Sequence, residues 1–201
     1  MDAGEILVLL FIVVLLFVLI THGYAGIIGA PWVPTKAKDI NRIIEVVGSC
    51  RTRTIIDLGC GGGRIMRAFS HAFPGSFVIG YELSVPVYII AVILNFFLLK
   101  HSSYRVLWRD FYRANFNNVD VIYCFLMPHA LKKLEPKFRE ELGSGSIVIS
   151  YAFPLPGWRG EEYRIPGKLP IYRYMGSCKP ALLSEDKGDA GVGVIDRGNN
   201  V

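Results

Sequence analysis

The chain has 201 residues and a formal net charge of +5, and 52% of its residues are hydrophobic. This length allows one domain with a full core plus short appendages. No run of Lys and Arg interleaved with aromatic residues is present, which argues against a nucleic-acid partner, whereas a mildly basic surface fits anionic lipid. The four widely spaced cysteines form no CxxC pair and the four histidines no HExxH spacing, so we expect neither a metal site nor a disulfide framework.

The chain begins with a long apolar segment. Residues 6–28 contain no Asp, Glu, Lys or Arg and include fifteen consecutive large apolar residues, 6–20. As a helix they would extend about 35 Å, against about 30 Å for a bilayer core. Two acids and no base precede the segment, which favours an uncleaved anchor over residues 1–29 rather than a secretory signal peptide or a buried core helix.

The charges that flank this segment predict its orientation. No Lys or Arg precedes it, and Lys36, Lys38 and Arg42 follow it closely. The positive-inside tendency therefore places the following domain on the cytoplasmic side. Reduced cysteines fit that side as well. The absence of a basic, Ser-rich leader favours a prokaryotic plasma membrane, with the mitochondrial inner membrane as the alternative.

Helical and strand patterns then alternate over residues 30–175. Helices are expected at 36–47, 64–73, 86–100 and 130–142, the last with a possible break at Pro136. Strands are expected at 51–58, 76–83, 104–108, 119–126 and 145–153, and a hairpin at 162–175. Near-continuous apolar strands alternating with helices predict an α/β fold with a mostly parallel central sheet covered on both faces. Residues 176–201 are expected to form a disordered tail.

The helix expected at 86–100 is apolar on every side, with Asn95 as its one polar residue between Tyr88 and Leu99. A helix that covers a sheet normally shows water a polar face, and this one is too short to span a bilayer. Its outer face is therefore expected to contact the bilayer or a partner, or else to be buried beneath the N-terminal helices.

A glycine-rich loop, DLGCGGGR, runs from Asp57 to Arg64 between an expected strand and an expected helix. Open α/β sheets bind ligands at this place. A phosphate-binding P-loop would need Gly-Lys-Ser/Thr at its end, which is missing here. The dinucleotide fingerprint GxGxxG also fails, because the sixth position is Arg64 or Met66. The spacing that is present is Asp57-x-Gly59-x-Gly61-x-Gly63.

This spacing resembles motif I of class I S-adenosylmethionine-dependent methyltransferases, which implies a Rossmann-like fold and that cofactor. Asp57 would orient the cofactor's ammonium, and glycines allow the backbone to approach closely. Glu82, nineteen residues after Gly63, would accept the ribose hydroxyls, although it could be only a surface acid. Asp110 would lie near the adenine, or else cap a helix or turn. The cofactor contacts implied by the resemblance are Thr35, Asp57, Gly59, Cys60, Gly61, Gly63, Glu82, Leu83 and Asp110.

Three further stretches narrow the resemblance. APWVPTKAKDINRIIEVV precedes the loop, GYELSVPVY follows it, and LMPHALKKLEPKFREELGSGSIVISYAFPLPGW closes the domain. In this order, behind a membrane span, they resemble the small membrane-anchored protein-lysine methyltransferases of mitochondria and their prokaryotic relatives, over residues 30–174. Mitochondrial members act on the ATP synthase c subunit and the adenine nucleotide translocase. Two departures stand out: Gly62 where the family usually has an acid, and Ser84-Val85 where it usually has Asn-Pro.

The closing motif FPLPGW supplies the candidate acceptor site. Phe153, Pro154 and Trp158 would form apolar walls for a lysine stem and help to desolvate its amine. Alternatively, the motif is a structural turn that packs Trp158 into the core. The PWVPT segment likewise has two interpretations, a lid over the cofactor or a stiff linker, and Trp32 could also be an interfacial anchor.

The resulting prediction is a membrane-anchored methyltransferase that modifies a lysine of a protein, in particular a membrane protein, without a metal. Two alternatives stay open. The acceptor could be a lipid, a quinone or another small apolar molecule, or the chain could be a catalytically silent cofactor-binding scaffold. The substrate does not follow from the resemblance, because substrate choice changes within one fold.

Overall fold

The computed structural model describes residues 2–28, 33–48, 52–98 and 103–176. Its helices are α1 (Ala3–Ile28), α2 (Ala37–Val47), α3 (Arg64–Ala72), α4 (Val85–Leu98), the 3-10 turn η1 (Phe111–Arg113) and α5 (Pro128–Glu141). Its strands are β1 (Thr54–Leu58), β2 (Phe77–Glu82), β3 (Tyr104–Trp108), β4 (Val121–Cys124), β5 (Ile147–Tyr151), β6 (Glu161–Tyr163) and β7 (Ile171–Met175). The helices and strands alternate as the sequence predicts for an α/β fold, and of the tail expected at 176–201 only Gly176 lies within the described residues.

The central sheet has seven strands in the order β3-β2-β1-β4-β5-β7-β6. The first five strands are parallel, and β7 pairs antiparallel with both β5 and β6. Because parallel strands place their carboxyl ends at one edge, the turns after β1, β2, β3, β4 and β5 gather there. Asp57 is in register with Gly80 on one side and with Tyr123 on the other.

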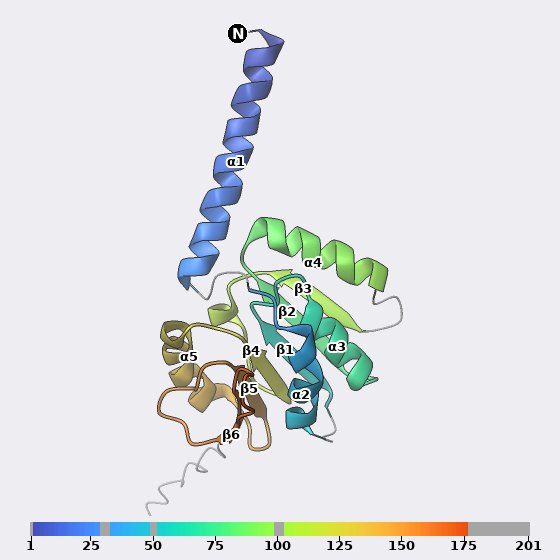
Figure 1. The fold of residues 1–201 in the computed structure, drawn as a ribbon, viewed down its shortest axis with the longest axis vertical. Helices are drawn as coiled ribbons and strands as arrows, with labels where there is room; N and C mark the ends of the chain where they lie inside the picture. Colours follow the sequence, from blue (N-terminus) through green and yellow to red (C-terminus); the bar gives the residue numbers. More distant parts are fainter. Residues whose placement is uncertain (1, 29–32, 49–51, 99–102, 177–201) are drawn as a thin grey trace, which may run out of the picture.

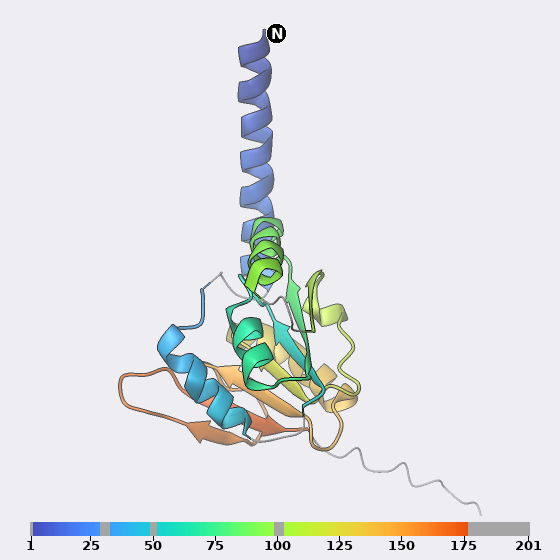
Figure 2. The same ribbon diagram turned by 90° about the vertical axis from the view of Figure 1, so that its right-hand side faces the viewer.

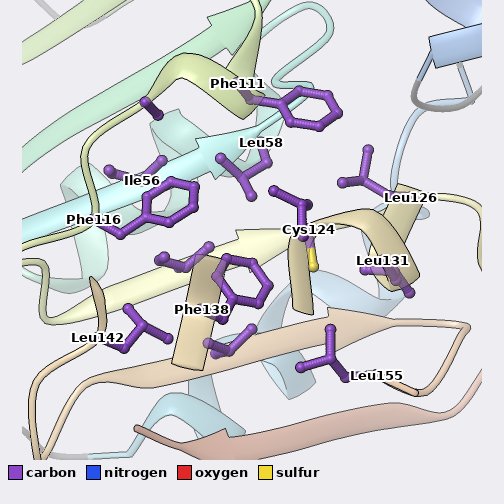
Figure 3. Close-up of a cluster of buried hydrophobic side chains, with 14 of the residues drawn as sticks. Ile56, Leu58, Phe111, Phe116, Cys124, Leu126, Leu131, Phe138, Leu142 and Leu155 are labelled. Atoms are coloured by element: carbon purple, nitrogen blue, oxygen red, sulfur yellow. The ribbon is translucent and has the colours of Figure 1, made fainter. Parts of the chain in front are cut away.

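Two apolar clusters cover the two faces of the sheet. In β1 and β4, Ile56 and Ile122 point to one face while Ile55 and Val121 point to the other, as the two-residue period of a strand requires. α5 and the segment around η1 cover the first face, whose side chains Figure 3 shows interdigitating. α2 and α3 cover the second. This two-sided burial explains why the central strands are apolar throughout.

Helix α5 departs from a simple expectation. α5 runs through Pro136 without a break. Pro136 has no N–H to donate a hydrogen bond to the carbonyl of Lys132. That turn is exposed, so water can donate the missing hydrogen bond.

Helix α1 stands away from the domain (Figure 1). Its stretch Ala3–Thr21 is long and apolar enough to cross a membrane and is unburied, and it is the only such helix in the described part of the chain.

Candidate active site

The glycine loop follows β1 and is fastened to the neighbouring strand by its backbone. The N–H groups of Gly59 and Cys60 both donate to the carbonyl of Tyr81, at 2.9 Å each. Gly59, Gly61 and Gly63 have φ values of 77°, 53° and 74°, a region that side-chain-bearing residues rarely adopt. This conformation turns the chain directly from β1 into α3.

The loop is also closely packed from behind. A Cβ atom on Gly63 would stand 2.2 Å from Nδ2 of Asn95, in the last turn of α4. Asn95 is fully buried, and its Oδ1 accepts from Arg67 Nη1 at 3.0 Å. The same Arg67 nitrogen donates to the carbonyl of Gly62 at 2.7 Å. Asn95 therefore helps to hold the glycine loop through Arg67. This role was not predicted from the sequence, although a lone amide among apolar residues was a usable signal.

The carboxylate of Glu82 joins the loop to the end of β2. Its Oε2 accepts from Gly61 N–H at 3.0 Å, and its Oε1 accepts from the N–H groups of Leu83 and Ser84 at 2.9 and 2.8 Å. Only 8% of the residue is exposed. These contacts make Glu82 a buried structural bridge rather than the plain surface acid of the alternative interpretation.

Asp57 is the second buried acid at this edge. It is 2% exposed. Burial, reinforced by the negative charge of Glu82, raises its pKa from 3.8 to about 8. Two acids held together in a dry site create a strong local preference for a cation. A ligand that carries an ammonium and a sulfonium satisfies this preference.

The segment before α2 reaches the same place. Thr35 Oγ1 and the hydroxyl of Tyr123 are 2.8 Å apart, and the Thr35 carbonyl accepts from Arg64 Nη1 at 3.1 Å. Since Tyr123 is in register with Asp57, Thr35 lies beside the glycine loop. Burial raises the pKa of Tyr123 well above its ordinary value, so its hydroxyl stays protonated. Trp32, the other candidate in this segment, lies outside the described residues.

Asp110 follows β3, the strand next to Glu82. Its Oδ1 accepts from the N–H of Tyr112 at 2.9 Å and so caps η1, which bears out the cap interpretation. The N–H of Arg109 donates to the carbonyl of Glu82, which brings the two acids to neighbouring strand ends. A carboxylate has two acceptor oxygens, so an aspartate that caps a helix with Oδ1 can contact a ligand with Oδ2.

The closing segment separates into two parts. Phe153 and Pro154 come directly after β5, at the carboxyl edge, in a turn where Ala152 has a φ of 74°. Such a conformation is strained for alanine and is common at functional sites. Trp158 instead stacks edge-on against Phe138 and Tyr174, and its Nε1 donates to Glu135 of α5 at 3.2 Å. Phe153 and Pro154 thus follow the carboxyl end of β5, at the sheet edge that also carries the glycine loop, whereas the contacts of Trp158 are with α5 and β7.

No group of three or more His, Cys, Asp or Glu side chains with metal-binding geometry occurs in the described residues. Cys60 and Cys124, near the loop, are buried free thiols, and burial raises the pKa of both. Both are therefore protonated near neutral pH and poor nucleophiles. The chemistry that this edge can support is the binding of a cationic cofactor beside an apolar turn.

Solved structures agree with this geometry. An RNA methyltransferase from Salinibacter ruber in complex with S-adenosyl-L-homocysteine superimposes with a TM-score of 0.66 and 26% identity, over 76% of this chain and all of that one. A magnesium protoporphyrin IX methyltransferase from Synechocystis with bound S-adenosylmethionine shares the fold at 14% identity, with a TM-score of 0.55, over 70% and 79% of the two chains. The fold and the glycine loop define a class I methyltransferase, and its cofactor is S-adenosylmethionine.

Sequence comparison gives the family. The model of the ANTKMT methyltransferase domain matches residues 57–162, and the chain belongs to this family. The human lysine N-methyltransferase of the ATP synthase c subunit is 28% identical over 156 residues, which are 72% of this chain and 60% of the human protein. A protein-lysine N-methyltransferase of Saccharolobus islandicus is 27% identical over 135 residues, 66% of this chain and 82% of that protein. The chain thus matches less than two thirds of the human relative's length.

Proposed function

We propose that the chain is a membrane-anchored, S-adenosylmethionine-dependent methyltransferase that modifies a lysine side chain of a membrane protein. The observation that carries this proposal is the extent of the family match. Residues 57–162 include both the glycine loop and the turn after β5, so the likeness covers the donor side and the acceptor side of the site. The human and the Saccharolobus relatives are both named as lysine methyltransferases.

We assign the donor side to the residues at the strand ends. The carboxylate of Asp57 receives the ammonium of the cofactor, and Glu82 receives the ribose hydroxyls while it holds Gly61 in place. The backbone of Gly59, Cys60, Gly61, Gly63 and Leu83 lines the approach, with Thr35 and Asp110 at its two sides. When bound, the cofactor supplies an electrophilic methyl group on a sulfonium centre.

The acceptor side must present a neutral amine to that methyl group. A lysine pKa of about 10.4 means that deprotonation at pH 7 costs roughly 4–5 kcal/mol. Apolar surroundings lower this cost because they destabilise the ammonium form. Phe153 and Pro154 are the proposed walls around the lysine stem, and Trp158, packed on α5, holds their segment in position. Alignment of the nitrogen with the methyl group then provides most of the catalysis.

The membrane part of the proposal is supported by α1, whose unburied apolar stretch is long enough to span a bilayer. Lys36, Lys38 and Arg42 follow it and favour a domain on the cytoplasmic side. Protease treatment of right-side-out and inside-out vesicles tests the orientation: the domain should be cleaved only in inside-out vesicles.

Radiolabelled S-adenosylmethionine tests the reaction. Purified protein is incubated with membranes from the native host lacking the gene, beside an Asp57→Ala control. The protein fraction is hydrolysed and analysed for methyl-lysine, and the lipid extract and the RNA are counted separately. Label in lysine of a discrete membrane protein is the expected result. Label only in the lipid extract or in RNA would transfer the assignment to those acceptors, and cofactor binding without label in any fraction would favour a silent scaffold.

A further inference from the structure

The outer face of α4 is a continuous apolar surface. None of its fourteen residues is charged, and eight of its apolar side chains are exposed. Ile93, Phe96 and Phe97 are 50%, 67% and 62% exposed. A helix that covers a sheet in water normally turns polar side chains outward. This face therefore lacks the composition that solvent exposure requires.

The domain cannot bury this face by rotating the helix. Val87, Ala91 and Asn95 point inward and are 2% exposed or less. Asn95 is fixed by Arg67, which also holds the glycine loop, so a rotation of α4 would break the contacts that shape the cofactor site. The outward direction of the apolar face is consequently built into the domain.

The position of α4 relative to α1 indicates what covers it. The two helices are in contact, and α4 lies crosswise to α1 where α1 meets the domain (Figures 1 and 2). The apolar face of α4 therefore lies beside the domain end of the helix whose apolar stretch Ala3–Thr21 is unburied. At fourteen residues, α4 is about 21 Å long, too short to cross a bilayer core of about 30 Å but suited to lie in its surface layer.

We propose that α4 lies in the interfacial layer of the bilayer that α1 crosses, with Ile93, Phe96 and Phe97 among the acyl chains. This inference rests on the membrane anchor of the proposed function. It has a consequence for the site, since α4 begins at Val85, just after Glu82, and α1 leads by a short segment to Thr35. Both connections end at the carboxyl edge of the sheet, so the site opens close to the membrane surface.

The test measures the surroundings of single side chains in the full-length protein in vesicles of phosphatidylcholine and phosphatidylglycerol. Cys50 and Cys178 are replaced by serine, and an environment-sensitive fluorophore is attached at Ile93→Cys or Phe97→Cys. The matched control is Glu140→Cys, an exposed position on α5. Each label is quenched separately by a nitroxide-bearing lipid and by iodide in the water.

We expect the α4 labels to be quenched by the nitroxide lipid and protected from iodide several-fold relative to the control. Iodide quenching equal to that at Glu140→Cys would overturn the proposal, because the face would then lie in water. Protection from both quenchers would also overturn it, since a second copy or another protein would cover the face. These readings need no methyl transfer, so they are independent of whether lysine is the acceptor.

Discussion

Replacement of Asp57 by asparagine should raise stability and weaken cofactor binding at the same time. The carboxyl is buried, and its pKa is raised from 3.8 to about 8 by burial and by Glu82. At pH 7 the folded protein therefore keeps this group protonated, whereas the unfolded chain ionises it. pH 7 lies about three units above 3.8, and each unit corresponds to about 1.4 kcal/mol, so the group destabilises the fold by on the order of 4 kcal/mol.

The sign of the pH dependence follows from the same values. Between pH 4 and pH 8 the folded state binds the proton and the unfolded state does not, so stability falls as pH rises through this range and levels off above about 8. Asparagine has no such titration. The cofactor-free Asp57→Asn protein should therefore melt several degrees higher than the wild type at pH 8, and the difference should disappear near pH 4.

Cofactor binding should respond in the opposite direction. The ammonium needs the carboxylate, so binding to the wild type releases a proton, and affinity should rise with pH up to about 8. Loss of a charge-assisted contact worth about 1.5–3 kcal/mol should weaken binding about 10–100-fold in Asp57→Asn. Binding is measured by calorimetry on both proteins across this pH range. A pH dependence that both proteins share comes from titration of the cofactor itself, and the difference between them comes from the Asp57 carboxyl.

Asp120→Asn is the matched control. Asp120 lies at the opposite end of the sheet, where its Oδ2 accepts from the N–H groups of Arg53 and Thr54 at 2.7 and 2.8 Å. Its replacement should lower stability and leave cofactor affinity unchanged. These expectations would be refuted if Asp57→Asn had the same melting temperature as the wild type at pH 8 and bound the cofactor with the same affinity and the same pH dependence.

Three further substitutions test separate parts of the site. Gly63→Ala should lower the free energy of unfolding by about 2 kcal/mol or more, because Gly63 has a φ of 74° and its added Cβ would clash with Asn95. Gly62→Ala should cost little, since the nearest atom to its added Cβ is 3.9 Å away. Equal losses in the two variants, measured by denaturant unfolding, would contradict this. Tyr123→Phe removes the 2.8 Å bond to Thr35 and should cost about 1 kcal/mol; an unchanged unfolding midpoint would speak against that bond. Trp158→Phe should lower stability without changing cofactor affinity, and a selective loss of affinity would instead place Trp158 at the cofactor.

Much of the fold could be predicted because its signals are local. The periods of two and 3.6 residues located the strands and helices, and the glycine loop stood out because only glycine tolerates three positive φ angles within five residues. The proximity of Glu82 to the loop followed from the rule that parallel strands share a carboxyl edge.

Long-range packing was harder to predict. Nothing local to residues 171–175 indicates that β7 inserts between β5 and β6. The sequence around Trp158 is the same whether its side chain lines a site or packs on Phe138. Only the three-dimensional path of the chain decides between these two roles. Asn95 had a visible oddity, a lone amide among apolar residues, but its partner Arg67 lies 28 residues away on another helix.

The outer strand β6 would affect how copies of the chain meet in the membrane proposed above. Confinement to a bilayer concentrates proteins in two dimensions, where an open sheet edge invites edge-to-edge pairing. β6 has only three residues, Glu161, Glu162 and Tyr163, and all are exposed. Glu161 and Glu162 are ion-paired with Arg173 and Arg164, and a strand of three residues has few free N–H and C=O groups for pairing with an identical strand. At the membrane surface proposed above, this edge would therefore offer little for another copy of the chain to pair with.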